Sequence, residues 1–448
     1  MTTPAVISAA AADLTRAINA TQVRVPGAAP LIWNAAAQHR PALIVRPESS
    51  FDVQIAIRVA RDRGMRLSVL GGGHDWLGRA VCDGGLVIDM SGMRSVTVDT
   101  TVPVATVGAG VTATDLTDAV TPYGLVAATG NCGGVGMAGL TLGGGYGPLN
   151  GRFGLASDNL VGAEVVLADG RTVAADATHE PELFWALRGG GGNFGVVTSM
   201  RVRLHPLDRL IGGMITFPWS QAATVWRGLG ELLSTAPDEL TVLSGLLCDP
   251  GGNPAVFLAP AFSGDHRCGE AAVDKLVKLG TPLTTQVAPM TYREWLSLFD
   301  AWSVRGQCWA IRTRTVAGYT PGVIDTLREA GRALTSPPSG IAIHHCHGAS
   351  TRVASDQTAF ANRRPHFVVE IVASWETGDG ATHHAWADAV SAALAPHAQP
   401  GGYANLLGPD DHEQVANAYG ENAVRLAAAK ARYDPDGVFT AIPLPSVG

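Results

Sequence analysis

The sequence predicts an α+β protein built from two domains. Short apolar segments alternate with helical segments as far as Leu204, which is the pattern of a sheet covered by helices. The texture changes near Pro206, after which Trp and His become more frequent and long glycine clusters disappear. A chain of 448 residues is also long enough for more than one domain.

The composition excludes several classes of protein. Hydrophobic residues make up 46% of the chain and charged residues 16%, so it can bury a core and is not expected to be disordered. The formal net charge is −7 and no long Lys/Arg run is present, which argues against nucleic-acid binding. No apolar run reaches about 18 residues, so no membrane-spanning helix is predicted. The Ala-rich start is typical of a helix rather than a signal peptide, so a cytoplasmic protein is expected.

Cysteine and glycine usage adds two further expectations. The six cysteines are too few and too scattered for a disulfide framework, so reduced thiols are expected. The 54 glycines lie in compact clusters, which indicate tight turns or close approach of backbone to a ligand. The Ala/Gly-rich composition is typical of a bacterial protein.

Local patterns predict the elements of the first domain in order. A helix capped by Ser50 should run to about Gly64, and another should begin near Thr114. Residues 169–170 form a hairpin turn. Residues 129–151 are too rich in glycine for a regular helix or strand, so an ordered loop against a ligand is expected. Apolar runs predict strands at 41–45, 67–70, 85–89, 104–108, 161–167 and 196–204.

The second part of the chain predicts a further domain, an antiparallel sheet backed by helices. Helices are expected at 226–233 and 268–279, and strands at 255–261, 309–315, 341–347 and 367–374. A tail helix should run from Tyr419 to about Arg432, with Glu421 and Arg425 paired, and end before Asp434. The expected boundaries are 1–207, with a core from about 38, then 208–409, and a C-terminal segment 410–448 that returns to the first domain.

A glycine run stands directly after one of the predicted strands. Gly71, Gly72 and Gly73 follow residues 67–70 and precede His74. Successive backbone N–H groups exposed in this way form a nest that can bind a phosphate or pyrophosphate. No Gly-Lys-Ser/Thr follows this run, as the Walker pattern requires, and no G-x-G-x-x-G opens a helix there, as the Rossmann pattern requires. A simple tight turn is the alternative interpretation.

Cys132 lies in a second glycine cluster, Gly130-Asn131-Cys132-Gly133-Gly134. A structural cysteine usually packs among apolar side chains, whereas glycine neighbours leave a thiol on exposed backbone. This placement suggests a reacting thiol, although a lone loop cysteine is more often structural. The combination with other motifs favours the reacting thiol.

Five motifs in order resemble one protein family. They are the GGGH run, the NCGG loop, GGGYG at 143–147, ALRGGGGNFG at 186–195 and YDPDGVF at 433–439. The set resembles the berberine-bridge-enzyme-like oxidases, bicovalent flavoproteins of the vanillyl-alcohol-oxidase superfamily with a PCMH-type FAD-binding domain. The resemblance covers nearly the whole chain. It implies that residues 1–207 bind FAD and that residues 208–409 bind the substrate.

The resemblance also implies how the cofactor is held. In that family the histidine bonds the flavin 8α-methyl group and the cysteine bonds flavin C6, here His74 and Cys132. Val135 matches the position that gates oxygen, where valine goes with oxidases, so oxidase activity giving H₂O₂ is expected. The residues that the resemblance places along FAD are Gly71, Gly72, Gly73, Asp75, Val135, Gly136, Gly143, Gly145, Tyr146, Asn159, Gly195 and Val196.

The catalytic base has two candidates. Many relatives carry it as the second Tyr of a Y-x-N-Y motif; here Tyr403 and Asn405 match, but Leu406 occupies the position of the second Tyr. The alternative is Glu370, which interrupts an apolar strand and shares a face with His366. Relatives place an acidic active-site residue at or near this point. A glutamate paired with an arginine at the domain interface is the other interpretation of Glu370.

A small set of side chains is expected around the substrate: Tyr146, Arg312, His345, His347 and Glu370. The run 344–347 looks like a metal site, but strand alternation puts His345 and His347 on one face and no further ligand is suitably placed, so no metal is expected. His345 or His347 should face the pocket. Arg312 has two readings, a substrate anion or a carboxylate at the domain interface.

These expectations combine into one function. The chain should be an FAD-dependent oxidase that moves hydride from an alcohol or hemiacetal CH–OH of a sugar-like or secondary-metabolite molecule to flavin N5, with O₂ as acceptor. The missing second Tyr and the lone Glu370 favour an alternative on the same fold, oxidation of a C–N or activated C–H bond. A non-catalytic flavin- or ligand-binding protein is a third possibility, against which the pairing of His74 with Cys132 argues. A monomer or homodimer with no nucleic-acid or membrane partner is expected.

Overall fold

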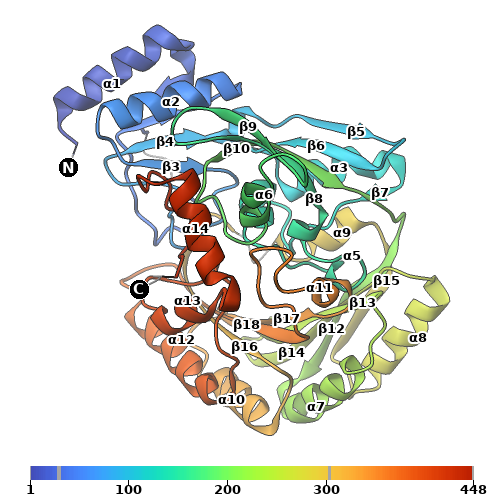
Figure 1. Cartoon of the computed structure of the whole chain (residues 1–448). Helices are drawn as coiled ribbons and strands as arrows, with labels where there is room; N and C mark the ends of the chain where they lie inside the picture. The colour runs from blue at the N-terminus through green and yellow to red at the C-terminus, as the bar shows by residue number, and fades with distance from the viewer. Residues whose placement is uncertain (1, 28–31, 301–303, 446–448) are drawn as a thin grey trace.

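The computed structural model describes residues 2–27, 32–300 and 304–445 (Figure 1). The strands as far as Arg203 form two main sheets. The first has the order β1-β2-β4-β3, with its last three strands parallel. Its strands are β1 (Val23–Arg24), β2 (Leu43–Val45), β3 (Leu67–Leu70) and β4 (Leu86–Asp89). The helices α1 (Pro4–Ala17) and α2 (Ser50–Asp62) share one apolar core with it.

Helix α2 shows how the local sequence determines this packing. It is capped by Ser49, one residue before the expected cap, and Asp52 completes a capping box by bonding back to the Ser49 backbone. Its residues Val53 and Ile57 are fully buried against the sheet. The strand β3 follows α2 in the chain, and the glycine run begins directly after its last residue, Leu70.

The second sheet is antiparallel and has the order β5-β6-β10-β8-β9. Its strands are β5 (Val96–Asp99), β6 (Val104–Gly108), β8 (Leu160–Val166), β9 (Thr172–Ala175) and β10 (Val196–Arg203). The helices α3 (Ala113–Val120) and α6 (Pro181–Leu187) pack into the same core. A two-stranded ribbon joins β7 (Leu125–Val126) to β11 (His205–Pro206).

The third sheet has seven antiparallel strands in the order β15-β12-β14-β13-β17-β18-β16. They are β12 (Leu210–Pro218), β13 (Leu240–Cys248), β14 (Pro254–Phe262), β15 (Thr284–Met290), β16 (Cys308–Val316), β17 (Gly340–Cys346) and β18 (His366–Trp375). The helices α7 (Ala222–Leu233), α8 (His266–Val277), α10 (Pro321–Arg332) and α12 (Ala381–Leu394) lie along its outer side (Figure 1). This architecture confirms the expected α+β class.

The C-terminal segment differs from the single helix that was expected. It forms α13 (His412–Asn417) and α14 (Ala423–Tyr433), separated by a 3₁₀ turn at Gly420–Asn422. Arg425 pairs with Glu182 of α6 rather than with Glu421, because α14 packs beside α6. The stop at Asp434 is confirmed, since its carboxylate accepts the backbone N–H groups that follow α14.

The glycine-rich region 129–151 also corrects an expectation. It contains the helix α4 (Met137–Leu142), and α5 (Asn150–Phe153) begins at its end. The reason is local: six residues between Gly136 and Gly143 include Met, Ala and two Leu, which are good helix formers. Among the described helices, none is long and apolar enough to cross a membrane.

Candidate active site

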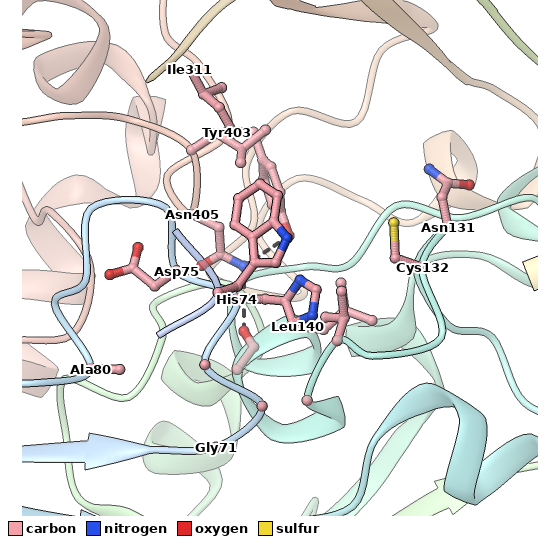
Figure 2. Close-up of a pocket in the computed structure, with 18 of the residues that line it drawn as sticks. Gly71, His74, Asp75, Ala80, Asn131, Cys132, Leu140, Ile311, Tyr403 and Asn405 are labelled. Atoms are coloured by element: carbon pink, nitrogen blue, oxygen red, sulfur yellow. Dashed lines mark hydrogen bonds between the residues drawn. The ribbon is translucent and has the colours of Figure 1, made fainter. Parts of the chain in front are cut away.

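A cavity of about 480 Å³ lies between the glycine-rich loops and the inner face of the seven-stranded sheet. Its size is in the range of small-molecule and cofactor sites. Figure 2 shows that His74 and Cys132 lie on two different loops beside the cavity, with Tyr403 and Asn405 nearby. The sequence-predicted residues that line it are Gly71, Gly72, Gly73, His74, Asp75, Cys132, Val135, Gly136, Tyr146, Gly195, Val196, Glu370, Tyr403 and Asn405.

Two glycine loops meet at this cavity. A Cβ atom on Gly72 would overlap the backbone of Gly136, and one on Gly134 would lie 2.9 Å from His74 Nε2. Only glycine allows the backbones to approach so closely. The second loop is also tied down, because its carbonyl groups at Gly133 and Val135 accept hydrogen bonds from the start of α3. His74 and Cys132, far apart in the sequence, therefore reach one cavity.

His74 is held in an aromatic stack. Its ring lies over Trp33 with 5.6 Å between centroids, and Trp33 in turn stacks on Trp309 at 4.9 Å. Burial lowers the pKa of His74 to about 4, and the positive charge of Arg305 adds to this. The imidazole is therefore neutral at physiological pH and keeps a lone pair, which is what attack on an electrophilic carbon requires.

Glu370 enters the cavity from β18, next to a histidine of β17. His344 Nε2 lies 2.9 Å from Glu370 Oε2, and Asn131 Nδ2 donates to His344 Nδ1 at 3.0 Å. All three side chains line the cavity. The alternative interpretation of Glu370 as an arginine partner is wrong, because its partner is this imidazole.

The expectation that His345 or His347 faces the pocket is also wrong. The register pairs His344 with Val368 and Ala342 with Glu370, so the even-numbered residues of β17 share the cavity face. His345 and His347 point to the opposite side, where their rings stack 3.9 Å apart. Burial lowers the pKa of His347 to about 4. No group of three or more metal-ligating side chains occurs within the described ranges.

Tyr403 lies beside the cavity with its hydroxyl already engaged. The hydroxyl accepts hydrogen bonds from Gly145 N at 3.1 Å and Asn405 Nδ2 at 2.9 Å. Burial raises the pKa of Tyr403 to about 12. Its ring lies 4.7 Å from that of Tyr146, whose hydroxyl contacts His366 at 3.2 Å. Tyr403 is therefore better suited to form part of the cavity wall and to donate a hydrogen bond than to act as a base.

Four further residues that were expected at the site do not line the cavity. Arg312 pairs with Asp388 of α12 at 2.7 Å, because alternation along β16 turns Ile311 inward and Arg312 outward. Asn159 donates to two backbone carbonyls and contacts His205, so it braces a turn. Gly143 and Gly145 lie behind the lining, where they make room for Asn405 and donate to Tyr403.

Sequence reasoning missed Asn131, His344, Ile311 and Trp33 as cavity residues. Asn131 had a signal, since it precedes Cys132 directly. For His344 the signal in the sequence was incomplete. Strand alternation separates it from His345, but only the pairing with β18 decides which of the two faces the cavity. Trp33 had none, because nothing in its neighbourhood links it to His74.

Comparisons with known proteins find similarity to FAD-linked oxidoreductases. Family models match an FAD binding domain at residues 41–176 and a berberine and berberine-like segment at residues 402–442. The (R)-6-hydroxynicotine oxidase of Paenarthrobacter nicotinovorans is 38% identical over 60% of this chain, an alignment that spans 59% of that relative. The FAD-linked oxidoreductase aurO of Gibberella zeae is 31% identical over 91% of this chain and 81% of its own length.

Solved structures give the same result. The 6-hydroxy-D-nicotine oxidase of Arthrobacter nicotinovorans superposes with a TM-score of 0.86 at 30% identity, covering 95% of this chain and 97% of its own. The xylooligosaccharide oxidase of Myceliophthora thermophila, in complex with xylobiose, gives 0.83 at 25% identity, covering 97% and 100%. Berberine bridge enzyme shares the fold, with a TM-score of 0.86 at 20% identity over 98% and 99%.

Proposed function

The chain belongs to the berberine-bridge-enzyme-like family of FAD-linked oxidoreductases, and on this premise we propose that it is an oxidase whose flavin is attached through both His74 and Cys132. The observation that carries the proposal is the arrival of an imidazole, His74, and of a thiol from a glycine-rich loop, Cys132, at one cavity. The backbone N–H groups of Gly71–Gly73 would hold the pyrophosphate. Two attachment points would fix the ring against the substrate side.

The reaction divides between the cofactor and this chain's own groups. Bound FAD supplies a two-electron acceptor for hydride. Glu370 takes the N–H or O–H proton of the atom next to the oxidised carbon, so that a C=N or C=O bond forms as the hydride leaves. Tyr146 and Tyr403 form a wall against which the substrate is placed, and the apolar sheet face excludes water.

Permanent attachment gives the first test. The yellow colour of the purified protein should stay with the acid-precipitated polypeptide, and its mass should exceed the chain mass by one FAD. Cys132→Ala and His74→Ala should each keep one link, since the other residue remains, whereas the double variant should lose the flavin on denaturation. Peptide mapping that finds both side chains unmodified in the wild type would overturn the proposal.

The substrate side of the cavity favours a compact, mostly apolar molecule. The seven-stranded sheet contributes mainly apolar side chains to it: Leu243, Leu246, Leu247, Phe257, Ile311, Val368 and Val372. The hydrogen-bonding side chains that the sheet adds are Trp309, His344 and Glu370, with Cys248 at the end of β13 and Ser339 directly before β17. A sugar carries a hydroxyl on most carbons, and each would need a partner when buried. We therefore place oxidation of a C–N or activated C–H bond ahead of the alcohol or sugar CH–OH reaction.

A substrate panel tests this order. Cyclic amines with an aromatic ring should bleach the anaerobic flavin faster than xylobiose or simple secondary alcohols of the same size. Val135 lines the cavity and is short enough to leave space for O₂, so turnover in air should release H₂O₂. Faster reduction by the sugar than by the amines would refute the proposed substrate class. Turnover that occurs only with an artificial acceptor under argon, and not in air, would refute the oxidase assignment.

A further inference from the structure

Three side chains from distant parts of the chain form one hydrogen-bonded line in the cavity. Asn131 comes from the loop that carries Cys132, His344 from β17 and Glu370 from β18. The side chains of His344 and Glu370 are 14% and 19% exposed, so they are largely withdrawn from solvent. Hydrogen bonds in such surroundings are stronger than in water and hold their groups in place.

The Asn131 amide determines which ring nitrogen of His344 carries the proton. The Asn131 amide nitrogen can only donate, so His344 Nδ1 accepts and carries no proton. The proton of a neutral imidazole then sits on Nε2, which donates to Glu370 Oε2. The second carboxylate oxygen, Oε1, is left to accept a proton from the substrate.

The surroundings of Glu370 make His344 its distinctive partner. Its neighbours across the sheet are Ala342 and Thr313, and the guanidinium groups of Arg312 and Arg314 point outward to α12. A guanidinium would bind the carboxylate as an ion pair and weaken it as a base. A neutral imidazole orients the carboxylate without adding a full positive charge.

We propose that His344 and Asn131 are positioning residues that aim Glu370 at the substrate, and that the loop bearing Cys132 thereby sets both the flavin and the base. This inference rests on the proposed function, in which Glu370 takes the proton. Asn131 adjoins Cys132, and the loop is anchored to α3 by hydrogen bonds from Ala113 and Thr114. Because the loop cannot shift without moving Asn131, the base keeps one orientation relative to the ring.

A double-mutant cycle on the holoenzyme tests the arrangement. His344→Gln should slow anaerobic flavin reduction by about 10²-fold, the scale expected for misplacing a reacting group, with little change in substrate affinity. In the double variant with Glu370→Gln, the rate should be no lower than for Glu370→Gln alone, since His344 acts through that carboxylate. Independent, multiplying effects would overturn the inference. His345→Gln, on the opposite face, is the matched control and should leave the reduction rate near the wild-type value.

A spectroscopic measurement complements the rates. In protein labelled with ¹⁵N-histidine, the signal lost in His344→Gln should show a protonated Nε2 and an unprotonated Nδ1. Asn131→Ala should change that pattern, and Asn131→Gln should restore it in part. A protonated Nδ1 in the wild type would overturn the inference. If instead the flavin of the Glu370→Gln variant is reduced at the wild-type rate, the assignment of Glu370 as the base fails. This outcome is distinct from a failure of the positioning role of His344 and Asn131.

Discussion

Glu370→Gln should slow anaerobic reduction of the flavin by about 10²–10⁴-fold, the usual contribution of a general base. The substitution keeps the shape of the side chain, and its amide oxygen can still accept the hydrogen bond from His344. What it removes is the ability to take a proton from the substrate. Stopped-flow reduction by a substrate that bleaches the wild-type flavin measures this effect directly.

Tyr403→Phe separates the two candidate bases. Its hydroxyl already accepts two hydrogen bonds and has a pKa raised to about 12, so its loss should cost far less than the loss of the carboxylate. Flavin content and the absorption spectrum should be unchanged in both variants. A near-wild-type rate for Glu370→Gln together with a large loss for Tyr403→Phe would assign the base to the tyrosine.

The local parts of the fold and site could be predicted from the sequence. The apolar run before Gly71 locates β3 because a buried strand followed by glycines has few other conformations. Likewise, Asp434 ends α14 as expected. These features depend on residues close together in the chain, and periodicity and turn chemistry describe such features well.

The parts that could not be predicted depend on strand pairing. Alternation separates His344 from His345 and Ile311 from Arg312, but either member of each pair can face inward until the neighbouring strand is known. The alternative to Glu370 as a base paired it with an arginine, because a buried carboxylate needs a partner. The register places His344 there instead, and no pattern within one strand records this.

A buried ion pair joins the two halves of the molecule behind the cavity. The two terminal guanidinium nitrogens of Arg363 contact Asp158, at 2.8 and 2.9 Å, and the side chains are only 4% and 9% exposed. Arg363 also donates to the backbone carbonyl groups of Ser350 and Phe360. The Phe360 ring meets Tyr146 edge to face at 5.9 Å, so the pair supports one wall of the proposed active site.

Asp158→Asn should lower the free energy of unfolding by about 3–5 kcal/mol, because it leaves a guanidinium buried without its counter-charge. Arg363→Met should cost a similar amount by stranding the carboxylate. Denaturant titration followed by tryptophan fluorescence measures both. Combining Asp158→Leu with Arg363→Met should recover much of the loss, since an apolar pair of similar volume has no charge to desolvate.

The exposed pair of Arg352 and Asp238 provides the matched control. Its side chains are 60% and 38% exposed, so Arg352→Met should change the free energy of unfolding by no more than about 1 kcal/mol. A comparable small effect for Asp158→Asn would show that water reaches the inner pair. A large loss of unfolding free energy, together with slower flavin reduction in the enzyme that remains folded, would instead connect the Arg363–Asp158 pair to the placement of the substrate. The connection would run through Phe360 and Tyr146.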